Sequence, residues 1–340
     1  MLVTVTGGTG FVGAHTVAEL VRAGHRVRLL VRGGSAVGAA LRPLEVPPGA
    51  VDAVLGDVTD ERSVAAAVRG ADAVVHAASV YSFDRRRRAE MRRTNARGTE
   101  VVLDAARRAG VGRVVHVSST AALFGPGVRV IGDDSPVGAS REPYAATKAA
   151  SEEVARRYQR QGAPVVISRP PALLGPHDPK LGDQVRRLRD TLRGIMPVWP
   201  AGGLQIGDVR DTAVLHAALL DPEVTAAHPL GAHFGPGHHL TTREYVDAVR
   251  RASGRALPAV FPPAALMGPV GRLTDLVQPV WPWHIPAEHE AIATVGAAVR
   301  VDPAASTLGL KPRPFADTVA DTVRWLVDTG AVTPRRTGGR

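Results

Sequence analysis

A glycine-rich turn near the start of the chain sets the strongest limit on its fold. The apolar run Leu2–Thr6 leads into a segment rich in glycine, and an amphipathic helical pattern follows up to Ala23. Glycines let a backbone turn tightly and approach a pyrophosphate, and free N–H groups at a helix N-terminus favour its negative charge. The segment fits both GxGxxG and GxxGxxG, so spacing alone does not select a subclass. A dinucleotide site is predicted at Gly7, Thr9, Gly10, Phe11, Val12 and Gly13.

Short β-branched runs alternate with longer helical patterns through the first half of the chain. This alternation predicts an α/β fold whose doubly wound parallel sheet carries helices on both faces and binds ligands at the carboxyl ends of its strands. Gly24, Gly70 and Gly110 follow three of the helical patterns, where a left-handed residue is expected. Strands are expected at Leu2–Thr6, Arg26–Val31, Val51–Leu55, Ala73–His76, Arg113–Val117 and Pro164–Ser168, and helices at Phe11–Ala23, Asp60–Arg69, Arg85–Arg108 and Tyr144–Gln161.

The composition of the chain changes after about Pro170, where prolines become frequent. We therefore expect a dinucleotide-binding domain over 1–170, a smaller substrate-binding region over 171–333 that is partly interleaved with the first sheet, and a disordered basic tail over 334–340. The stretch Ala256–Pro286 follows no clean period. Within the second region, short strands are expected at Leu204–Ile206 and Ala232–Phe234, and helices at Asp208–Leu220 and Thr241–Ala252.

The composition of the chain excludes several classes of protein and makes others less expected. Cysteine is absent, which rules out a disulfide framework and a thiolate nucleophile. No apolar run reaches the ~18 residues of a membrane span and no signal peptide is visible, so a cytoplasmic protein without membrane contact is expected. The formal charge of +10 comes largely from scattered arginines, so nucleic-acid binding is a minor alternative. His238 and His239 are adjacent and their rings would diverge, so no metal site is expected.

The end of the second expected strand bears on cofactor choice. The strand closes with Val31-Arg32-Gly33-Gly34-Ser35 and has no carboxylate to hold ribose hydroxyls. The planar guanidinium of Arg32 is suited to a 2′-phosphate, and Ser35 adds a hydroxyl donor. The sequence therefore favours NADP(H) over NAD(H), unless Arg32 simply faces solvent.

A group of hydroxyl and amine side chains is expected at the carboxyl edge of the sheet. Ser118, Ser119 and Thr120 follow the fifth expected strand, and Tyr144 and Lys148 lie one helical turn apart. A phenol has a pKa of ~10, and a neighbouring ammonium and an oxidised nicotinamide would both favour its phenolate form. Only three of the 42 basic residues are lysines, so a lysine at this position is informative.

These residues and several further segments resemble the extended short-chain dehydrogenase/reductases, which include NAD-dependent epimerases and dihydroflavonol 4-reductase-like enzymes. The resemblance covers most of the chain and implies a Rossmann-type sheet, a possible homodimer, and catalysis by Thr120, Tyr144 and Lys148, with Ser119 as the alternative to Thr120. It also implies that Asp57 and Val58 contact adenine and that Ala77, Ala78 and Pro170 line the cofactor. The segments are Thr6–Gly13, Gly56–Val58, His76–Ala78, Thr94–Thr99, Tyr144–Lys148, Ser168–Pro176, Val301–Leu310 and Asp317–Trp325.

Two departures from the family patterns indicate a branch. Sugar-nucleotide dehydratases carry an Asp-Glu pair after the catalytic hydroxyl, whereas this chain has Ala121 and Ala122. Epimerases usually carry an Asn in the loop where this chain reads Pro170–Leu174. The chain most resembles NADPH-dependent reductases of a ketone or aldehyde on a fairly hydrophobic small molecule. The alternatives are a hydroxysteroid-type alcohol dehydrogenase or epimerase, and a non-catalytic protein that senses the cofactor or binds nucleic acid.

Overall fold

A parallel sheet of seven strands forms the centre of the molecule. The computed structural model describes residues 1–81, 87–221, 223–224, 231–277 and 289–333. The strand order is β10-β7-β5-β4-β1-β2-β3, and every neighbouring pair is parallel. The strands are β1 (Leu2–Thr6), β2 (Arg26–Val31), β3 (Val51–Leu55), β4 (Ala73–His76), β5 (Arg113–Val117), β7 (Val165–Arg169) and β10 (Ala232–Phe234).

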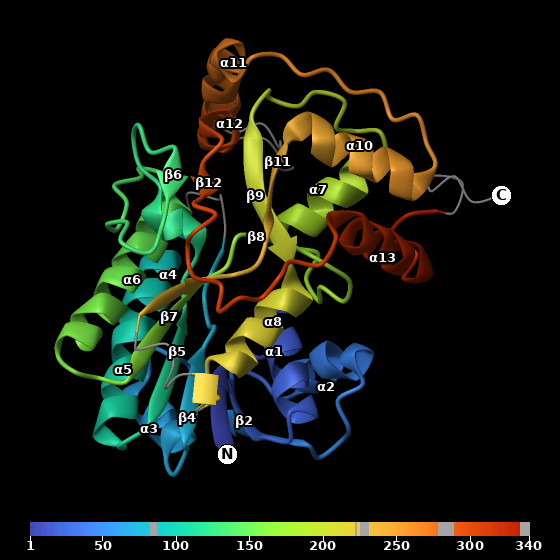
Figure 1. Ribbon diagram of the computed structural model, residues 1–340. Coiled ribbons are helices and arrows are strands. Elements are labelled where there is room, and N and C mark those ends of the chain that lie inside the picture. The colour runs from blue at the N-terminus through green and yellow to red at the C-terminus, as the bar shows by residue number, and fades with distance from the viewer. Residues whose placement is uncertain (82–86, 222, 225–230, 278–288, 334–340) are drawn as a thin grey trace.

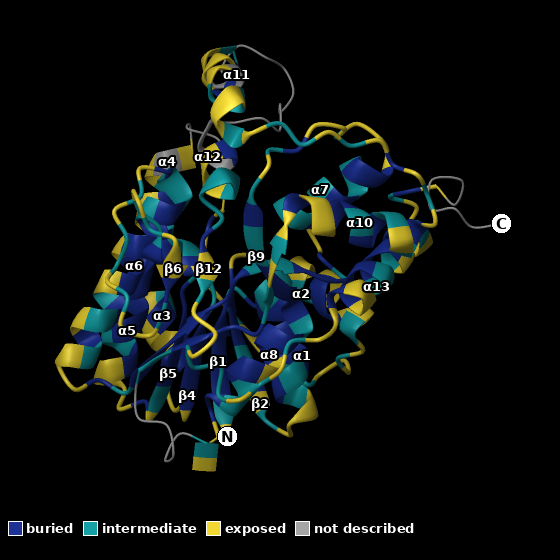
Figure 2. Ribbon diagram, turned by 45° about the horizontal axis from the view of Figure 1, so that its top comes forward, coloured by how far each residue is buried: buried dark blue, intermediate teal, exposed yellow. Residues whose placement is uncertain are grey.

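Helices cover both faces of this sheet, which confirms the expected α/β fold (Figure 1). One face packs against α1 and α8, and the other against α3, α5 and α6. Every residue of β4 and β7 is buried, as expected of parallel strands covered on both faces. Figure 2 shows the buried sheet between its helices. The helices are α1 (Phe11–Arg22), α2 (Ser35–Leu41), α3 (Glu61–Val68), α5 (Gly98–Arg108), α6 (Pro143–Arg160) and α8 (Val209–Ala218).

The order in which the strands are added to the sheet changes direction at β1, and open α/β sheets bind ligands at such a point. β1 pairs with β2 on one side and with β4 on the other, so the order of the strands reverses at this position. Helices on successive crossovers then lie on opposite faces, which leaves a crevice at the carboxyl ends of β1 and β4. Gly24, Gly70 and Gly110 have φ of 77°, 66° and 68°, which confirms the expected left-handed helix ends.

The helix expected over Arg85–Arg108 differs from the observed structure. The described part begins as the short α4 (Arg88–Met91), continues as a π-helical segment at Arg92–Arg97 and ends as α5. The wider turn lets Asn95 point inward, where only 1% of it is exposed. Such π-helical turns occur frequently at functional sites.

The second half of the chain contributes a three-stranded sheet in the order β11-β9-β8. An apolar cluster that includes Trp199, Tyr245 and Phe315 joins this sheet to the surrounding helices. A two-stranded sheet pairs β6 with β12. The remaining elements are β6 (Val130–Ile131), β8 (Ala172–Leu174), α7 (Asp183–Leu192), β9 (Gly203–Asp208), β11 (His238–Thr241), α10 (Thr242–Ser253), α11 (Ala264–Val277), α12 (His289–Ala297), β12 (Arg300–Val301) and α13 (Phe315–Asp328), with 3-10 turns at Arg42–Leu44 and Thr120–Leu123.

The second half of the chain is interleaved with the main sheet through β10 and α8, and it contains a helix that the sequence did not indicate. The strand β10 pairs with β7 at the edge of the main sheet, and α8 packs on α1. The stretch 256–286 shows no clean period in the sequence, yet its residues Ala264–Val277 form the helix α11 with Pro269 inside it, and residues 278–286 lie outside the described part of the chain. A proline within a helical pattern removes a hydrogen bond and conceals the helix from sequence analysis. The expected basic tail, 334–340, and Arg85 and Arg86 lie outside the described residues.

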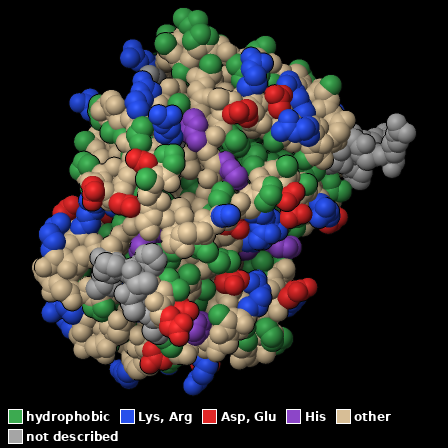
Figure 3. Space-filling model, viewed as in Figure 1, with side chains coloured by type: hydrophobic (Ala, Val, Ile, Leu, Met, Phe, Trp, Pro, Cys, Tyr) green, Lys and Arg blue, Asp and Glu red, His purple; other side chains and the backbone are tan. Residues whose placement is uncertain are grey.

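None of the helices in the described part of the chain is long and apolar enough to cross a membrane. The helix α11 nevertheless exposes Leu266, Leu273 and Leu276. In Figure 3, apolar side chains gather at the top of the molecule, where Figure 1 places this helix. On the same face, basic side chains are interspersed with acidic ones.

Candidate active site

The glycine-rich turn is packed so closely that a side chain at Gly7 or Gly13 would clash with the backbone. Gly7 has φ of 75°, and a Cβ there would lie 2.6 Å from the backbone nitrogen of Ala78. A Cβ on Gly13 would overlap the carbonyl oxygen of Gly7. Gly10 donates its N–H to that same oxygen over 2.9 Å and begins α1 without a side-chain cap. The N–H groups of the first helical turn, at Phe11, Val12 and Gly13, are thus available to an anion, and the residues present fit a dinucleotide pyrophosphate.

The ends of neighbouring strands complete this edge. The backbone nitrogens of Ala77 and Ala78 donate to the carbonyl and hydroxyl oxygens of Thr6, over 3.1 and 3.3 Å. Residues predicted to contact the cofactor therefore lie against the end of β1. The contacts of Thr9, Val58 and Pro170 with a cofactor stay predictions.

Asp57 and Arg32 lie at the next strand ends. Burial acts to raise the pKa of Asp57, but hydrogen bonds from Thr59 and the charges of Arg32 and Arg93 hold that pKa below its ordinary value. The side chain of Arg32 is exposed at the end of β2. Its charge acts on Asp57 at the neighbouring strand end, and its side chain is accessible to solvent.

The first turns of α6 position Tyr144 and Lys148. Pro143 occupies the first helical position, and the carboxylate of Glu142 caps the helix by accepting the N–H of Tyr144 over 2.8 Å. Lys148 is one turn further on and buried, and its Nζ donates to the carbonyl oxygen of Val117 over 2.9 Å. Burial lowers the pKa of Lys148 to about 8, although the nearby Glu152 acts to raise it.

Tyr144 is held as a neutral phenol. Burial raises its pKa above the ordinary value, a hydrogen bond with Ser119 acts in the opposite direction, and Glu142 and Asp183 raise it further. The ring of Tyr81 packs edge-on against Tyr144, with the ring centroids 4.4 Å apart. The sequence led us to expect an ammonium that lowers this pKa. In the protein alone burial dominates and holds the pKa of Tyr144 above its ordinary value.

Three hydroxyls follow β5, and the structure gives them different surroundings. Ser118 donates to the carboxylate of Glu152 over 2.6 Å. Ser119 is the hydroxyl that hydrogen-bonds Tyr144, and it also accepts the N–H of Ala121. Thr120 is buried, and its N–H donates to the carbonyl oxygen of Pro170. The catalytic assignment of Thr120 over Ser119 stays a prediction.

A buried ionic cluster behind Lys148 was missed in the sequence. Glu152 is fully buried on α6 and receives hydrogen bonds from Ser118, from Arg169 over 3.0 Å and from Arg156 over 2.7 Å. Arg169, at the end of β7, is only 2% exposed. The available signal was the position of Glu152, one helical turn beyond Lys148.

Asn95 connects the π-helical turn to the same helix. Its amide donates to the carbonyl oxygen of Val80 and to the hydroxyl of Thr147, and its Oδ1 accepts the N–H of Val80 over 2.7 Å. These bonds fix the segment that leads to Tyr81. Asn95 thus positions a wall of the site, although sequence analysis noted it only through the resemblance.

His76 and His116 are buried in the main sheet. The Nδ1 of His76 hydrogen-bonds Thr6 over 2.7 Å, and its Nε2 hydrogen-bonds Thr99 over 3.0 Å. His116 hydrogen-bonds Ser151 and stacks on His76. Burial lowers the pKa of His76 to about 3, so this ring is neutral. Among the residues the structure describes, no group of three or more His, Cys, Asp or Glu is arranged to hold a metal.

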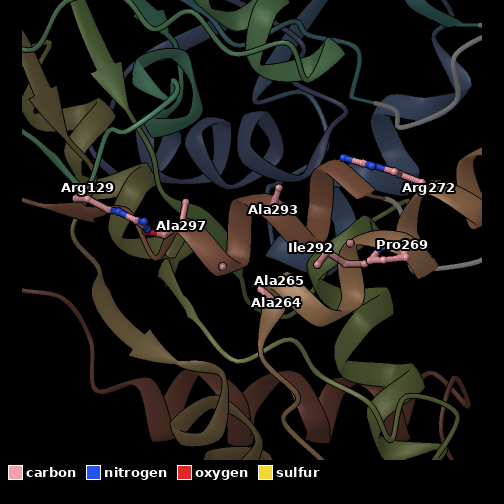
Figure 4. A pocket seen from close by; sticks show the side chains of 10 residues that line it. Arg129, Ala264, Ala265, Pro269, Arg272, Ile292, Ala293 and Ala297 are labelled. Atoms are coloured by element: carbon pink, nitrogen blue, oxygen red, sulfur yellow. The ribbon is translucent and has the colours of Figure 1, made fainter.

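A separate cavity of about 570 Å³ lies between α11 and α12 (Figure 4). Small apolar side chains, including Ala264, Ala265 and Ala293, line it together with Arg129 and Arg272. None of the predicted catalytic or cofactor-binding residues lines this cavity.

The fold and these residues define an enzyme of the extended short-chain dehydrogenase/reductase class. The glycine-rich turn lies at the reversal point of a parallel sheet, and Tyr144 and Lys148 lie one turn apart at the same sheet edge.

The chain belongs to the NAD dependent epimerase/dehydratase family, whose model matches residues 3–223. It is 30% identical over 347 residues to the sterol demethylase protein B of Methylococcus capsulatus (strain Bath), covering 98% of this chain and 100% of that protein. It is 30% identical over 343 residues to a putative dihydroflavonol 4-reductase of Synechocystis, covering 96% and 95%. The crystal structure of gox2253 superposes with a TM-score of 0.79 at 26% identity, covering 98% of this chain and 99% of that one.

Proposed function

We propose that this protein is an NADPH-dependent reductase of a ketone or aldehyde on a fairly hydrophobic small molecule. The observation that carries the proposal is the Tyr144 phenol hydrogen-bonded to the Ser119 hydroxyl, with the buried Lys148 one helical turn further along α6. Ala121 and Ala122 follow the hydroxyls where a dehydratase needs an acid and a base. The similarity to a putative dihydroflavonol 4-reductase supports the same reading.

The side chains of the site have distinct tasks in such a reaction. The hydroxyl of Thr120, or of Ser119, donates a hydrogen bond to the carbonyl oxygen of the substrate. Tyr144 transfers its hydroxyl proton to that oxygen as negative charge develops there. The Lys148 ammonium then favours the phenolate that remains. Bound NADPH supplies the hydride that reaches the carbonyl carbon, so that the products are an alcohol and NADP⁺.

The preference for NADPH rests on the end of β2. Arg32 is exposed at this strand end, and the segment Val31–Ser35 that closes the strand contains no Asp or Glu. Its guanidinium can form two parallel hydrogen bonds with a 2′-phosphate, which NADH lacks.

Cofactor titrations of the purified protein test both parts of the proposal. NADPH should bind more tightly than NADH, and Arg32→Ala should weaken NADPH binding about 10-fold or more with little effect on NADH, as expected for loss of a charge-assisted contact. Arg26→Ala is a matched control because Arg26 is exposed at the opposite end of the same strand. An unchanged NADPH/NADH ratio in Arg32→Ala would show that the 2′-phosphate is recognised elsewhere. Preference for NAD⁺ would replace reduction with alcohol oxidation or epimerisation.

A further inference from the structure

The cavity between α11 and α12 has the volume and the lining of a ligand site. Its volume of about 570 Å³ is within the range of about 300–1,000 Å³ that small-molecule sites occupy. The two helices approach closely at one point, since a Cβ on Gly296 would lie 2.5 Å from the Cβ of Ala264. Ile292 of α12 and Pro269 of α11 form apolar walls of the cavity (Figure 4). The cavity therefore offers apolar surface to a small molecule.

Two arginines give this apolar cavity a positive charge. Arg129, just before β6, and Arg272 of α11 both line it, and Figure 4 shows their guanidinium ends pointing toward each other across Ala293 and Ala297 of α12. Arg129 also donates to the carbonyl oxygen of Ala297 over 2.5 Å. Both arginines are exposed, and neither forms an ion pair with any residue that the structure describes. Guanidinium groups without a carboxylate partner are available to an anionic ligand.

The apolar surface of α11 continues beyond Arg272. Ala265, Pro269 and Arg272 all line the cavity, and their spacing of three and four residues places them in one row along the helix. Leu276 extends this row by another helical turn and is 75% exposed. A ligand bound at Arg272 therefore has apolar surface on both sides of the charge, inside the cavity and beyond it.

We propose that this cavity is a second ligand site, which binds an alkyl or acyl chain that ends in an anionic head group. The charge of the head group complements Arg129 and Arg272, and the chain removes the apolar walls from water. The carboxylate of a fatty acid and the phosphate of a phosphorylated lipid share this chemistry. The inference does not depend on the proposed reductase function, because none of the residues assigned to the reaction centre lines the cavity.

Binding of decanoate to the full-length protein, measured by calorimetry, tests this site. Decanoate should bind about 10-fold or more tightly than 1-decanol, as expected for a hydrogen bond to a charged group. It should bind about 100-fold or more tightly than butyrate, whose short chain buries much less apolar surface. Decyl phosphate distinguishes the two sources of the ligand: tighter binding of decyl phosphate than of decanoate indicates a phosphorylated lipid, and the reverse order indicates a fatty acid.

Substitutions at the cavity assign the binding to it. Arg272→Ala and Arg129→Ala should each weaken decanoate binding about 10-fold and change decanol binding by less than about 3-fold, since only a charged contact is lost. Arg62→Ala is the matched control, because it removes an exposed arginine of α3 that does not line the cavity. Ala293→Trp should fill the cavity and abolish the binding of both ligands. Because Ala293 is exposed on the cavity wall, the larger side chain should not disturb folding.

Several results would overturn the inference. They are absence of binding by decanoate and decyl phosphate, equal affinity for decanoate and decanol, and unchanged decanoate binding in Ala293→Trp. Binding to phosphatidylglycerol vesicles without binding of decanoate would assign the surface to a membrane instead. Dimers that Ala293→Trp dissociates, again without decanoate binding, would assign it to a second copy of the chain. Each of these outcomes leaves the reductase function intact, since ketone reduction with NADPH is measured in the absence of these ligands.

Discussion

Replacing Glu152 with alanine should destabilise the protein far more than replacing its neighbour on the same helix. Glu152 is fully buried, and its removal takes from Arg169, only 2% exposed, the carboxylate with which it forms an ion pair over 3.0 Å. Breaking a buried ion pair by removing one partner typically costs about 3–5 kcal/mol. Ser118 also loses the acceptor of its 2.6 Å hydrogen bond.

The expected change in melting temperature follows from the chain length. An entropy of unfolding of about 2.1 cal/mol/K per residue gives about 0.7 kcal/mol/K for 340 residues. A loss of about 3–5 kcal/mol therefore lowers the Tm by about 4–7 °C. Calorimetry or the loss of circular dichroism on heating would measure this difference.

Glu153 provides the control for this measurement. It forms an ion pair with Arg160 over 2.8 Å, but the two side chains are 55% and 62% exposed. Exposed pairs contribute about 0–1 kcal/mol, so Glu153→Ala should change the Tm by less than about 1.5 °C. Equal and small shifts in the two variants would refute the reasoning that burial makes the Glu152 cluster important.

Three other perturbations address the site. Tyr144→Phe should remove most turnover yet leave NADPH affinity within severalfold, and equal turnover in steady-state assays would exclude Tyr144 as the proton donor. Gly13→Ala should abolish cofactor binding measured by fluorescence, because the added Cβ meets the Gly7 carbonyl, whereas Gly38→Ala, with open space around it, should bind normally. Turnover should fall as pH rises through about 8, where Lys148 loses its proton. The unfolded chain holds that proton more tightly, so the Lys148 contribution to the unfolding free energy should increase from about pH 8 upward, and Lys148→Met should remove this increase in pH-dependent denaturation.

The main sheet was predictable because its strands are short, valine-rich and bounded by clear turns. The strands β1 to β5 have the expected bounds, and β7 begins one residue later than expected. The π-helical turn was not predictable, since its formation depends on tertiary hydrogen bonds of Asn95 with Val80 and Thr147. No local pattern in the sequence records such contacts.

The candidate site was predictable to the level of residue types. The Tyr144 and Lys148 pair follows from helical spacing, because residues four apart share a face. Which hydroxyl meets Tyr144 depends on side-chain rotamers at the end of β5, where Ser119 and Thr120 are adjacent. Burial is the main cause of the raised pKa of Tyr144, and Asp183, which adds to it, comes from a helix that the sequence analysis did not anticipate, so its effect required the three-dimensional fold.

The position of β10 at the sheet edge has a consequence for how this protein is made and recombined. Synthesis must pass Phe234 before β7 gains the partner strand that covers its outer backbone. Until then the nascent chain exposes an unpaired edge, a known starting point for aggregation. A chimaera that exchanges substrate regions between relatives should therefore keep β10 and α8 with the parent that supplies β7 and α1, and a join placed simply at residue 170 would separate them.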